Sequence, residues 1–365
     1  MGLSLEGDNG IKMDKKGIAV IGRLAEGTEL LDGQTVKTKI LRDELRHYFP
    51  EKKIICVDVY QYHKRFLIIL WNILKAFLEC EHIFVLLSRN GRTFLFPVLT
   101  GLNRIFHRRL YHDVIGGALP KEAQESPALA KQLCRFEVNW VEFQGMKEEL
   151  AKAGVTNVEV LPNFKRLNIV SEKEIQQQIE EPLVFVMFSR ILKEKGMEEA
   201  AEAIRNVNSR FGKQRAVLYI YGPIEPSYGE AFKQLLDDYQ DCVNYMGCVS
   251  YDESVRVLSG SYMLLFPTVY RGEGMPGTII DAFSAGLPVI ATDWHFNSEL
   301  VHNGITGYCY DWRKPELLTE WIVYAIEHPE VVYKMRKSCL IEAAKYTPDA
   351  SMKQIRKRIN GTMEK

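Results

Sequence analysis

The sequence lacks the features by which several protein classes are identified. Its seven cysteines are odd in number and scattered, and no Cys-x-x-Cys pair occurs in the 365 residues. This pattern disfavours a disulfide framework and a zinc site, and it predicts reduced thiols that mostly serve as small core residues. Basic and acidic side chains balance at 47 each, so no overall field favours nucleic acid as a partner.

Two common nucleotide-binding motifs are also missing. Gly22 and Gly27 have the spacing of a P-loop, but Thr28-Glu29 stands where that motif needs Lys followed by Ser or Thr. No G-x-G-x-x-G follows the first expected strand, which disfavours a dehydrogenase. Any phosphate site must therefore be built from other loops.

Long apolar runs are absent as well. The longest, Phe66–Leu78, is interrupted by Asn72 and Lys75 and is too short to span a bilayer. The polar residues 1–16 contain no apolar core and are expected to form a disordered leader, not a signal peptide. Basic residues next to apolar helices, at 63–78 and 94–109, would suit a lipid surface, but packing on a sheet is the alternative for each.

What is present is a regular alternation of apolar strands and amphipathic helices, which predicts parallel sheets wrapped by helices. Strands are expected at 17–23, 54–59, 82–87, 109–115, 140–143, 158–161, 183–188, 216–221, 243–246, 263–266 and 288–292. Helices are expected at 35–47, 66–78, 94–106, 146–153, 196–211, 231–239, 251–259, 277–285, 315–327, 330–344 and 351–359.

The length predicts two α/β domains, since it exceeds one ordinary core. The polar stretch after Pro162-Asn163 is expected to be a hinge, covering residues 166–182. The two domains are then 17–165 and 183–342, followed by a C-terminal segment, 343–365. Ligands bind at the carboxyl ends of parallel strands, so the cleft between the domains is the expected site.

A glycine-rich turn in the second half places two carboxylates around a helix start. Glu273 and Asp281 stand at either end of Gly274-Met275-Pro276-Gly277-Thr278. A helix N-terminus binds anions, whereas carboxylates accept hydrogen bonds from hydroxyls. The plainer alternatives are a turn residue for Glu273 and a first-turn helix acid for Asp281. Phosphate and hydroxyl recognition in one loop indicates a nucleotide-sugar.

A second segment, Ser189–Gly196, joins a buried strand to a helix and carries two cations. Arg190 and Lys195 would lie near the helix N-terminus, where they could hold a diphosphate. A solvated charged loop is the alternative for this segment alone. The carboxylate-bearing loop in the same half favours the phosphate site.

These segments resemble the retaining GT-B glycosyltransferases of family 4, most strongly between Pro182 and Tyr310. The resemblance covers nearly the whole chain and is weaker in the first half. It implies two Rossmann-like domains that face each other across a cleft. It also implies that 17–165 binds the acceptor, that 183–342 binds the donor, and that the C-terminal helix, 343–365, returns to the first domain.

The resemblance also implies residue roles. Arg190 and Lys195 match the family's diphosphate-binding R-x4-K, and Glu273 matches the first acid of E-x7-E, near the donor sugar hydroxyls. Asp281 replaces the second glutamate, on the ribose, and is one methylene shorter. The backbone from Gly274 through Met275, Pro276 and Gly277 to Thr278 would bind sugar and phosphate. No D-x-D occurs, so no metal and no cofactor is expected.

In the first half, Gly33-Gln34 matches the family's glycine loop near the donor phosphate, with one glycine in place of a pair. Many members have a histidine facing the donor sugar, but His112 is expected inside a strand and is read as structural. His295 follows a strand of the second domain and is left open between a substrate contact and a surface residue.

The implied activity is transfer of a sugar from a nucleotide diphosphate-sugar to a hydroxyl of a glycan or lipid-linked saccharide, with retention. The resemblance is closest to bacterial enzymes that build capsular and other surface polysaccharides, so a bacterial origin is expected. The expected location is the cytoplasm, with peripheral contact to the inner face of the plasma membrane. The alternatives are a nucleotide-sugar epimerase of the same fold and a non-catalytic sugar-binding subunit.

Overall fold

The computed structural model describes residues 17–28, 32–175 and 180–361 of the chain. The leader expected at 1–16 and hinge residues 176–179 lie outside this part. The chain divides between Asp113 and Val114 into two compact units, and each is described by itself. The domain boundaries at 165, 182 and 342 stay predictions.

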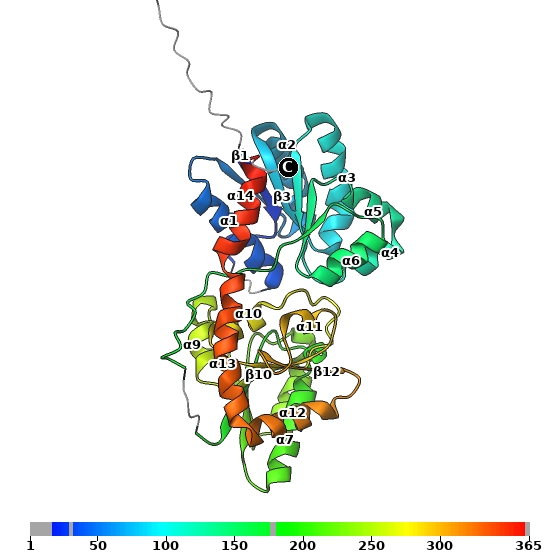
Figure 1. Ribbon diagram of the computed structural model, residues 1–365. Helices are drawn as coiled ribbons and strands as arrows, with labels where there is room; N and C mark the ends of the chain where they lie inside the picture. The colour runs from blue at the N-terminus through cyan, green and yellow to red at the C-terminus, as the bar shows by residue number, and fades with distance from the viewer. Residues whose placement is uncertain (1–16, 29–31, 176–179, 362–365) are drawn as a thin grey trace, which may run out of the picture. The chain divides into compact units, whose positions relative to one another are not determined.

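The strands form two sheets of six, ordered β2-β1-β3-β4-β5-β6 and β12-β11-β10-β7-β8-β9 (Figure 1). Their bounds are β1 Gly17–Gly22, β2 Ile54–Asp58, β3 Cys80–Leu86, β4 Arg109–Asp113, β5 Val138–Val141, β6 Val158–Val160, β7 Leu183–Phe188, β8 Ala216–Tyr221, β9 Val243–Gly247, β10 Met263–Phe266, β11 Val289–Thr292 and β12 Gly307–Tyr310. The expected α/β class, two parallel Rossmann-like sheets, is confirmed.

The helices connect these strands. Their bounds are α1 Gly33–Tyr48, α2 Tyr62–Glu79, α3 Arg89–Phe106, α4 Leu119–Glu125, α5 Pro127–Leu133, α6 Gln144–Lys152, α7 Met197–Phe211, α8 Gly229–Asp238, α9 Ser254–Ser259, α10 Gly277–Ser284, α11 Asn297–Leu300, α12 Glu316–Glu327, α13 Pro329–Ala343 and α14 Pro348–Ile359. Four short elements, α4, α5, α11 and β12, were not expected from the sequence.

In the first unit, β1 is buried along its whole length and pairs in parallel with β2 and β3. A strand with neighbours on both sides and helices on its faces must be apolar throughout, which explains why its apolar run was recognisable. Helix α1 begins where the Asp32 carboxylate accepts a hydrogen bond from the Thr35 backbone N–H, at 3.2 Å. Helices α2 and α3 pack against each other.

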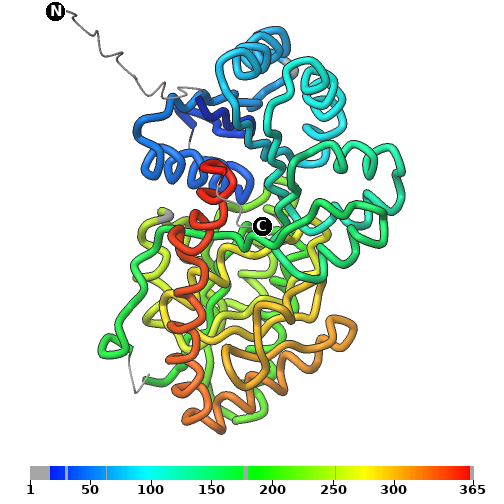
Figure 2. The backbone as a smooth tube through the Cα atoms, turned by 45° about the horizontal axis from the view of Figure 1, so that its top comes forward, coloured from blue at the N-terminus to red at the C-terminus, as the bar shows by residue number. Residues whose placement is uncertain are grey.

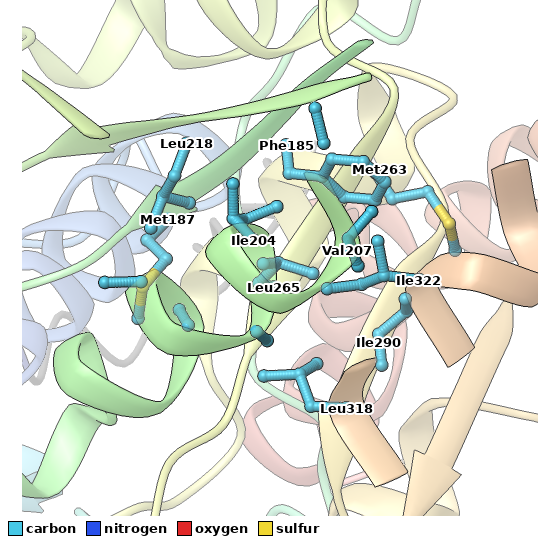
Figure 3. Packing of buried hydrophobic residues seen from close by; sticks show 14 of the residues in the cluster. Phe185, Met187, Ile204, Val207, Leu218, Met263, Leu265, Ile290, Leu318 and Ile322 are labelled. Atoms are coloured by element: carbon cyan, nitrogen blue, oxygen red, sulfur yellow. The ribbon is translucent and has the colours of Figure 1, made fainter. Parts of the chain in front are cut away.

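A core of the second unit lies between the sheet β12-β11-β10-β7-β8-β9 and helices α7 and α12. Figure 3 shows Phe185 and Leu265 from the central strands meeting Ile204 of α7 and Ile322 of α12. All four side chains are buried. Each such side chain stabilises the fold by about 2 kcal/mol when it leaves water, so this core fixes the carboxyl ends of β7 and β10.

The last two helices follow one another, α13 leading through a short turn into α14 (Figure 2). Gln354 and Arg358 of α14 both reach the carboxylate of Glu159 on β6, Gln354 at 3.0 Å. The Arg358 Nη1 atom also lies 3.7 Å from the Glu137 Oε1 atom. Polar contacts thus tie helix α14 to strand β6.

All seven cysteines are free thiols. Cys80, Cys242 and Cys339 are buried, and burial raises the pKa of the Cys80 and Cys242 thiols to about 11. These thiols therefore stay protonated at neutral pH and pack as small apolar groups.

Candidate functional site

Three of the four charged residues singled out in the second half, Arg190, Lys195 and Glu273, gather at one edge of the second sheet. Strands β7 and β10 are parallel neighbours, so the segments that follow them emerge at the same edge. Arg190 follows the last residue of β7 by two positions, and Thr268 follows β10 by the same step. Topology thus places the Arg190–Lys195 loop beside the loop that leads to Glu273.

Lys195 and Glu273 form a direct ion pair, and both side chains are nearly buried, at 7% and 11% exposed. The Thr268 hydroxyl donates to the same Glu273 carboxylate oxygen at 3.1 Å. The Lys195 ammonium also lies 5.2 Å and 5.3 Å from the ring centres of Phe266 and Tyr270, which suits a desolvated cation. The carboxylate is held in one orientation by two donors.

Arg190 joins this cluster through an aromatic ring. Its guanidinium lies 5.5 Å from the centre of the Tyr270 ring, which Lys195 also approaches. The Arg190 side chain is half-buried. Two cations therefore converge on one side chain, an arrangement that would be unfavourable without an anion nearby.

Two glycines allow the loops to pack this closely. Gly222, after β8, has φ of +137°, and a Cβ there would lie 1.9 Å from the Ser189 carbonyl oxygen. Gly196, with φ of +79°, leads into α7, and a Cβ there would lie 2.5 Å from the Pro267 carbonyl oxygen. Both positions require glycine for their backbone angle and for lack of space.

The glycine-rich turn after Glu273 ends in a helix N-terminus without a side-chain cap. Helix α10 begins at Gly277, and no side chain of the preceding Pro276 caps its first N–H groups. The Met275 backbone N–H donates to the buried carboxylate of Glu142 at 2.7 Å. The Thr278 hydroxyl is buried without a hydrogen-bond partner in the described chain. Uncapped N–H groups of this kind suit an anion.

Asp281 lies in the middle of α10, where it is buried and paired with another residue. Its carboxylate forms an ion pair with Lys165, the residue just before the expected hinge. Burial raises the pKa of Asp281, against the opposing effect of Lys165 and of a hydrogen bond from Ser254. The first-turn position considered from the sequence does not describe it well, because the fifth residue of the helix is a core position here. The ribose contact implied by the resemblance stays a prediction.

Gly33 and Gln34 belong to the first unit. Gly33 is the first residue of α1, and the buried Gln34 side chain donates from its amide to the Leu86 carbonyl at 3.1 Å, at the end of β3. His112 lies inside β4, fully buried, with its ring 4.9 Å from that of Phe96. The position expected for His112 within a strand agrees with this.

His295 has a backbone φ of +52°, an unusual value for a residue other than glycine. Its ring lies 4.8 Å from that of Trp294, whose indole donates to the Tyr270 carbonyl at 2.9 Å. Burial lowers the pKa of His295, while a hydrogen bond to the Arg271 backbone and the Glu273 charge raise it. The loop after β11 thus packs on the loop that carries Glu273.

Thr268, Glu142 and Lys165 were not singled out from the sequence, although each contacts a residue that was. Thr268 and Glu142 follow β10 and β5 closely, so polarity at the carboxyl end of an apolar strand was the available signal. Lys165 offered none, because its partner Asp281 is 116 residues away. Among the described residues, no three His, Cys, Asp or Glu side chains gather as metal ligands.

Comparison with known proteins finds a family model that matches the part of the chain that carries these loops. Residues 182–328 fit the model of the family described as glycosyl transferases group 1. The amylovoran biosynthesis glycosyltransferase AmsK of Erwinia amylovora is 27% identical over 161 residues, which are 42% of this chain and 38% of AmsK. This chain therefore spans well under two thirds of that relative.

Solved structures share the fold over nearly the whole chain. Anabaena HepE in complex with UDP superposes with a TM-score of 0.76 at 15% identity, covering 94% of this chain and 100% of HepE. The HepE complex with UDP-glucose gives a TM-score of 0.74 at 16% identity, covering 95% of this chain and 100% of HepE. The fold is the GT-B fold, and residues 182–328, which match the group 1 glycosyl transferase family model, carry Arg190, Lys195, Glu273 and Asp281.

Proposed function

We propose that this chain is a glycosyltransferase that moves a sugar from a nucleotide diphosphate-sugar to an acceptor hydroxyl, with retention of anomeric configuration. The observation that carries the proposal is the cluster of Arg190, Lys195 and Glu273 at the edge of the second sheet, beside the uncapped start of α10. The group 1 domain match supports it. The names of the relatives, an amylovoran biosynthesis glycosyltransferase and a protein in complex with UDP and with UDP-glucose, point to the same chemistry.

The cations would stabilise the leaving diphosphate. Arg190 can bind phosphate through two parallel N–H donors. Lys195 has three N–H donors, of which the ion pair with Glu273 uses one. Charge develops on the diphosphate as the glycosidic bond breaks, so fixed cations and helix N–H groups lower the barrier without a metal ion.

Glu273 would orient the donor sugar. Lys195 and Thr268 both donate to one oxygen of its carboxylate and so fix its orientation. A carboxylate has more than two acceptor positions, so it can also accept hydrogen bonds from sugar hydroxyls. The backbone of Gly274, Met275, Pro276, Gly277 and Thr278 would contribute N–H groups to sugar and phosphate. A positioned donor converts the transfer into an effectively unimolecular step.

For retention, the acceptor hydroxyl would approach the anomeric carbon on the face from which the diphosphate leaves. A diphosphate oxygen would take the acceptor proton, so no separate protein base is needed. Within the first unit, Gly33 and Gln34 would contribute to phosphate binding. The acceptor is proposed to be a glycan or a lipid-linked saccharide in polysaccharide biosynthesis, at the cytoplasmic face of the membrane.

Donor binding gives the direct test. The melting temperature of the wild-type chain should rise with UDP- or GDP-sugars, because a ligand that binds only the folded state stabilises it. With the sugar that gives the largest rise, Arg190→Ala and Glu273→Ala should each lower transfer by at least about a hundredfold. Arg210→Ala is the matched control, since Arg210 pairs with Glu320 in an exposed position of the same unit and should leave transfer unchanged.

Three outcomes discriminate the proposal from its alternatives. Near wild-type transfer in both site variants would show that the residues are wrongly identified. Conversion of a nucleotide-sugar without any acceptor would indicate an epimerase. Donor binding without release of nucleoside diphosphate, whatever acceptor is supplied, would indicate a non-catalytic sugar-binding subunit.

A further inference from the structure

Exposed apolar side chains concentrate on two helices of the first unit. Of the 13 exposed large hydrophobic residues in the described chain, seven lie on α2 and α3: Phe66, Leu67, Ile68, Trp71, Leu78, Phe94 and Ile105. Leu67 is 80% exposed, Trp71 66% and Ile105 73%. Single exposed apolar residues are ordinary, whereas a cluster of this size marks an interaction surface.

Together, these exposed side chains of two packed helices make up the α2–α3 face. Helices α2 and α3 are labelled in Figure 1 and pack against each other. The ring centres of Tyr62 and Phe94 lie 6.1 Å apart, and those of Phe77 and Phe106 lie 5.8 Å apart. Along α2, Leu67, Trp71 and Leu78 recur at helical spacing and point away from the buried Ile73 and Phe77. Helix α2 is therefore apolar on its inner and outer sides.

Charge of one sign accompanies this face. Lys64, Arg65 and Lys75 of α2 and Arg104 of α3 are all exposed. Across the two helices the one acidic side chain is Glu79, which forms an ion pair with Lys53 at 2.6 Å. An apolar face with cations around it is complementary to a surface that offers both hydrocarbon and negative charge.

We propose that this α2–α3 face docks on an anionic lipid surface. Cations near such a surface meet negative headgroups, while Trp71 and the aliphatic side chains enter the boundary with the acyl chains. A second copy of the chain fits less well, because a symmetric contact would bring the cations of both copies together. No helix in the described part of the chain is long and apolar enough to cross a membrane. The inference does not depend on the enzymatic activity proposed above.

Vesicle co-sedimentation of the full chain tests the proposal. The wild type should sediment with vesicles of phosphatidylcholine and phosphatidylglycerol, and far less with phosphatidylcholine alone. The double variant Leu67→Gln/Trp71→Gln should reduce the partition coefficient by at least about tenfold, because two large apolar groups no longer leave water. Ile341→Gln is the matched control, since Ile341 is 69% exposed on α13 in the other unit, and it should bind like the wild type.

Two further measurements separate lipid docking from other roles. Lys64→Gln and Arg65→Gln should each lower binding to anionic vesicles by about fivefold and leave the far-UV circular dichroism unchanged. Brominated lipids should quench the fluorescence of the wild type more than that of Trp71→Phe, because only the former places Trp71 at the bilayer. Equal sedimentation of wild type and the double variant would overturn the proposal. So would a dimer in solution that the double variant abolishes, with no vesicle binding by the wild type.

Discussion

Lys195 and Glu273 lie 78 residues apart in the sequence and form a nearly buried ion pair in the folded chain. The pair exists because β7 and β10 are neighbours in the second sheet, so the loops that follow them meet. Neither residue would be at this edge if the strand order were different. The ion pair therefore connects the topology of the sheet to the proposed chemistry of the site.

Removing one member of this pair should destabilise the second unit. Glu273→Gln keeps an oxygen that can accept from Thr268 but leaves the Lys195 charge buried without its counter-ion. The cost should be about 3 kcal/mol in the free energy of unfolding, measured by urea denaturation. The double variant Lys195→Met/Glu273→Gln should recover most of this loss, because no unpaired charge remains.

An exposed ion pair provides the comparison. Glu320→Gln breaks the pair with Arg210, whose side chains are about half exposed. Such pairs contribute roughly 0 to 1 kcal/mol, so this variant should differ little from the wild type. If Glu273→Gln is no more destabilising than Glu320→Gln, then water or another group compensates Lys195 and the pair is not a structural constraint.

Two glycines with positive φ should respond differently to alanine. Gly222→Ala would place a Cβ 1.9 Å from the Ser189 carbonyl oxygen, whereas Gly212→Ala, at φ of +64°, meets no atom within 4 Å. We expect Gly212→Ala to cost about 1 kcal/mol from backbone strain alone. Gly222→Ala should cost several times more, as measured by thermal unfolding. Equal melting temperatures would show that the loop carrying Arg190 can move aside without loss.

The sequence predicted the parallel sheets well, because buried strands between helices must be apolar along their whole length. The strand at Leu183–Phe188 was expected with the bounds that the structure has. Short elements could not be predicted in this way. Helices α4 and α5 have seven residues each, too few for a clear period, and β12 has four residues and begins at a glycine.

Candidate site residues could be proposed from the sequence where they stood in local motifs. Arg190, Lys195 and Glu273 stand in turns at strand ends, and the structure brings them together. The partners Thr268, Glu142 and Lys165 could not be assigned, because pairing between distant segments depends on the three-dimensional arrangement. Asp281 shows the limit most clearly. Its spacing from Glu273 was visible in the sequence, but its ion pair with Lys165 was not.

The Asp281–Lys165 pair allows ribose binding to be separated from structure. Because burial is the dominant effect on the pKa of Asp281, the pair is costly to keep in the core. Asp281→Asn and Lys165→Met should each destabilise by about 3 kcal/mol, and the double variant should be at least as stable as either single variant. If Asp281 also holds the ribose, UDP affinity of the stable double variant should fall by about tenfold. Unchanged affinity, measured by calorimetry, would restrict Asp281 to a structural role.

His82 should make the first unit sensitive to mild acid. The imidazole is buried on β3, with its Nδ1 3.0 Å from the Tyr111 hydroxyl. Burial lowers the pKa of His82 from 6.5 to about 4. The unfolded chain therefore binds a proton between these two values that the folded chain does not, so stability falls as the pH drops below 6.5 and this loss is complete near pH 4.

Between pH 7 and pH 5 this one histidine should remove about 2 kcal/mol from the free energy of unfolding. His82→Asn keeps a polar group near the Tyr111 hydroxyl but cannot be protonated in this range. The variant should start less stable at pH 7 because the smaller side chain packs less well, and its stability should then change less towards pH 5. Urea denaturation of both proteins at pH 7, 6 and 5 measures the two slopes. Parallel slopes would mean that the imidazole gains a proton within the folded unit, which its burial beside Tyr111 argues against.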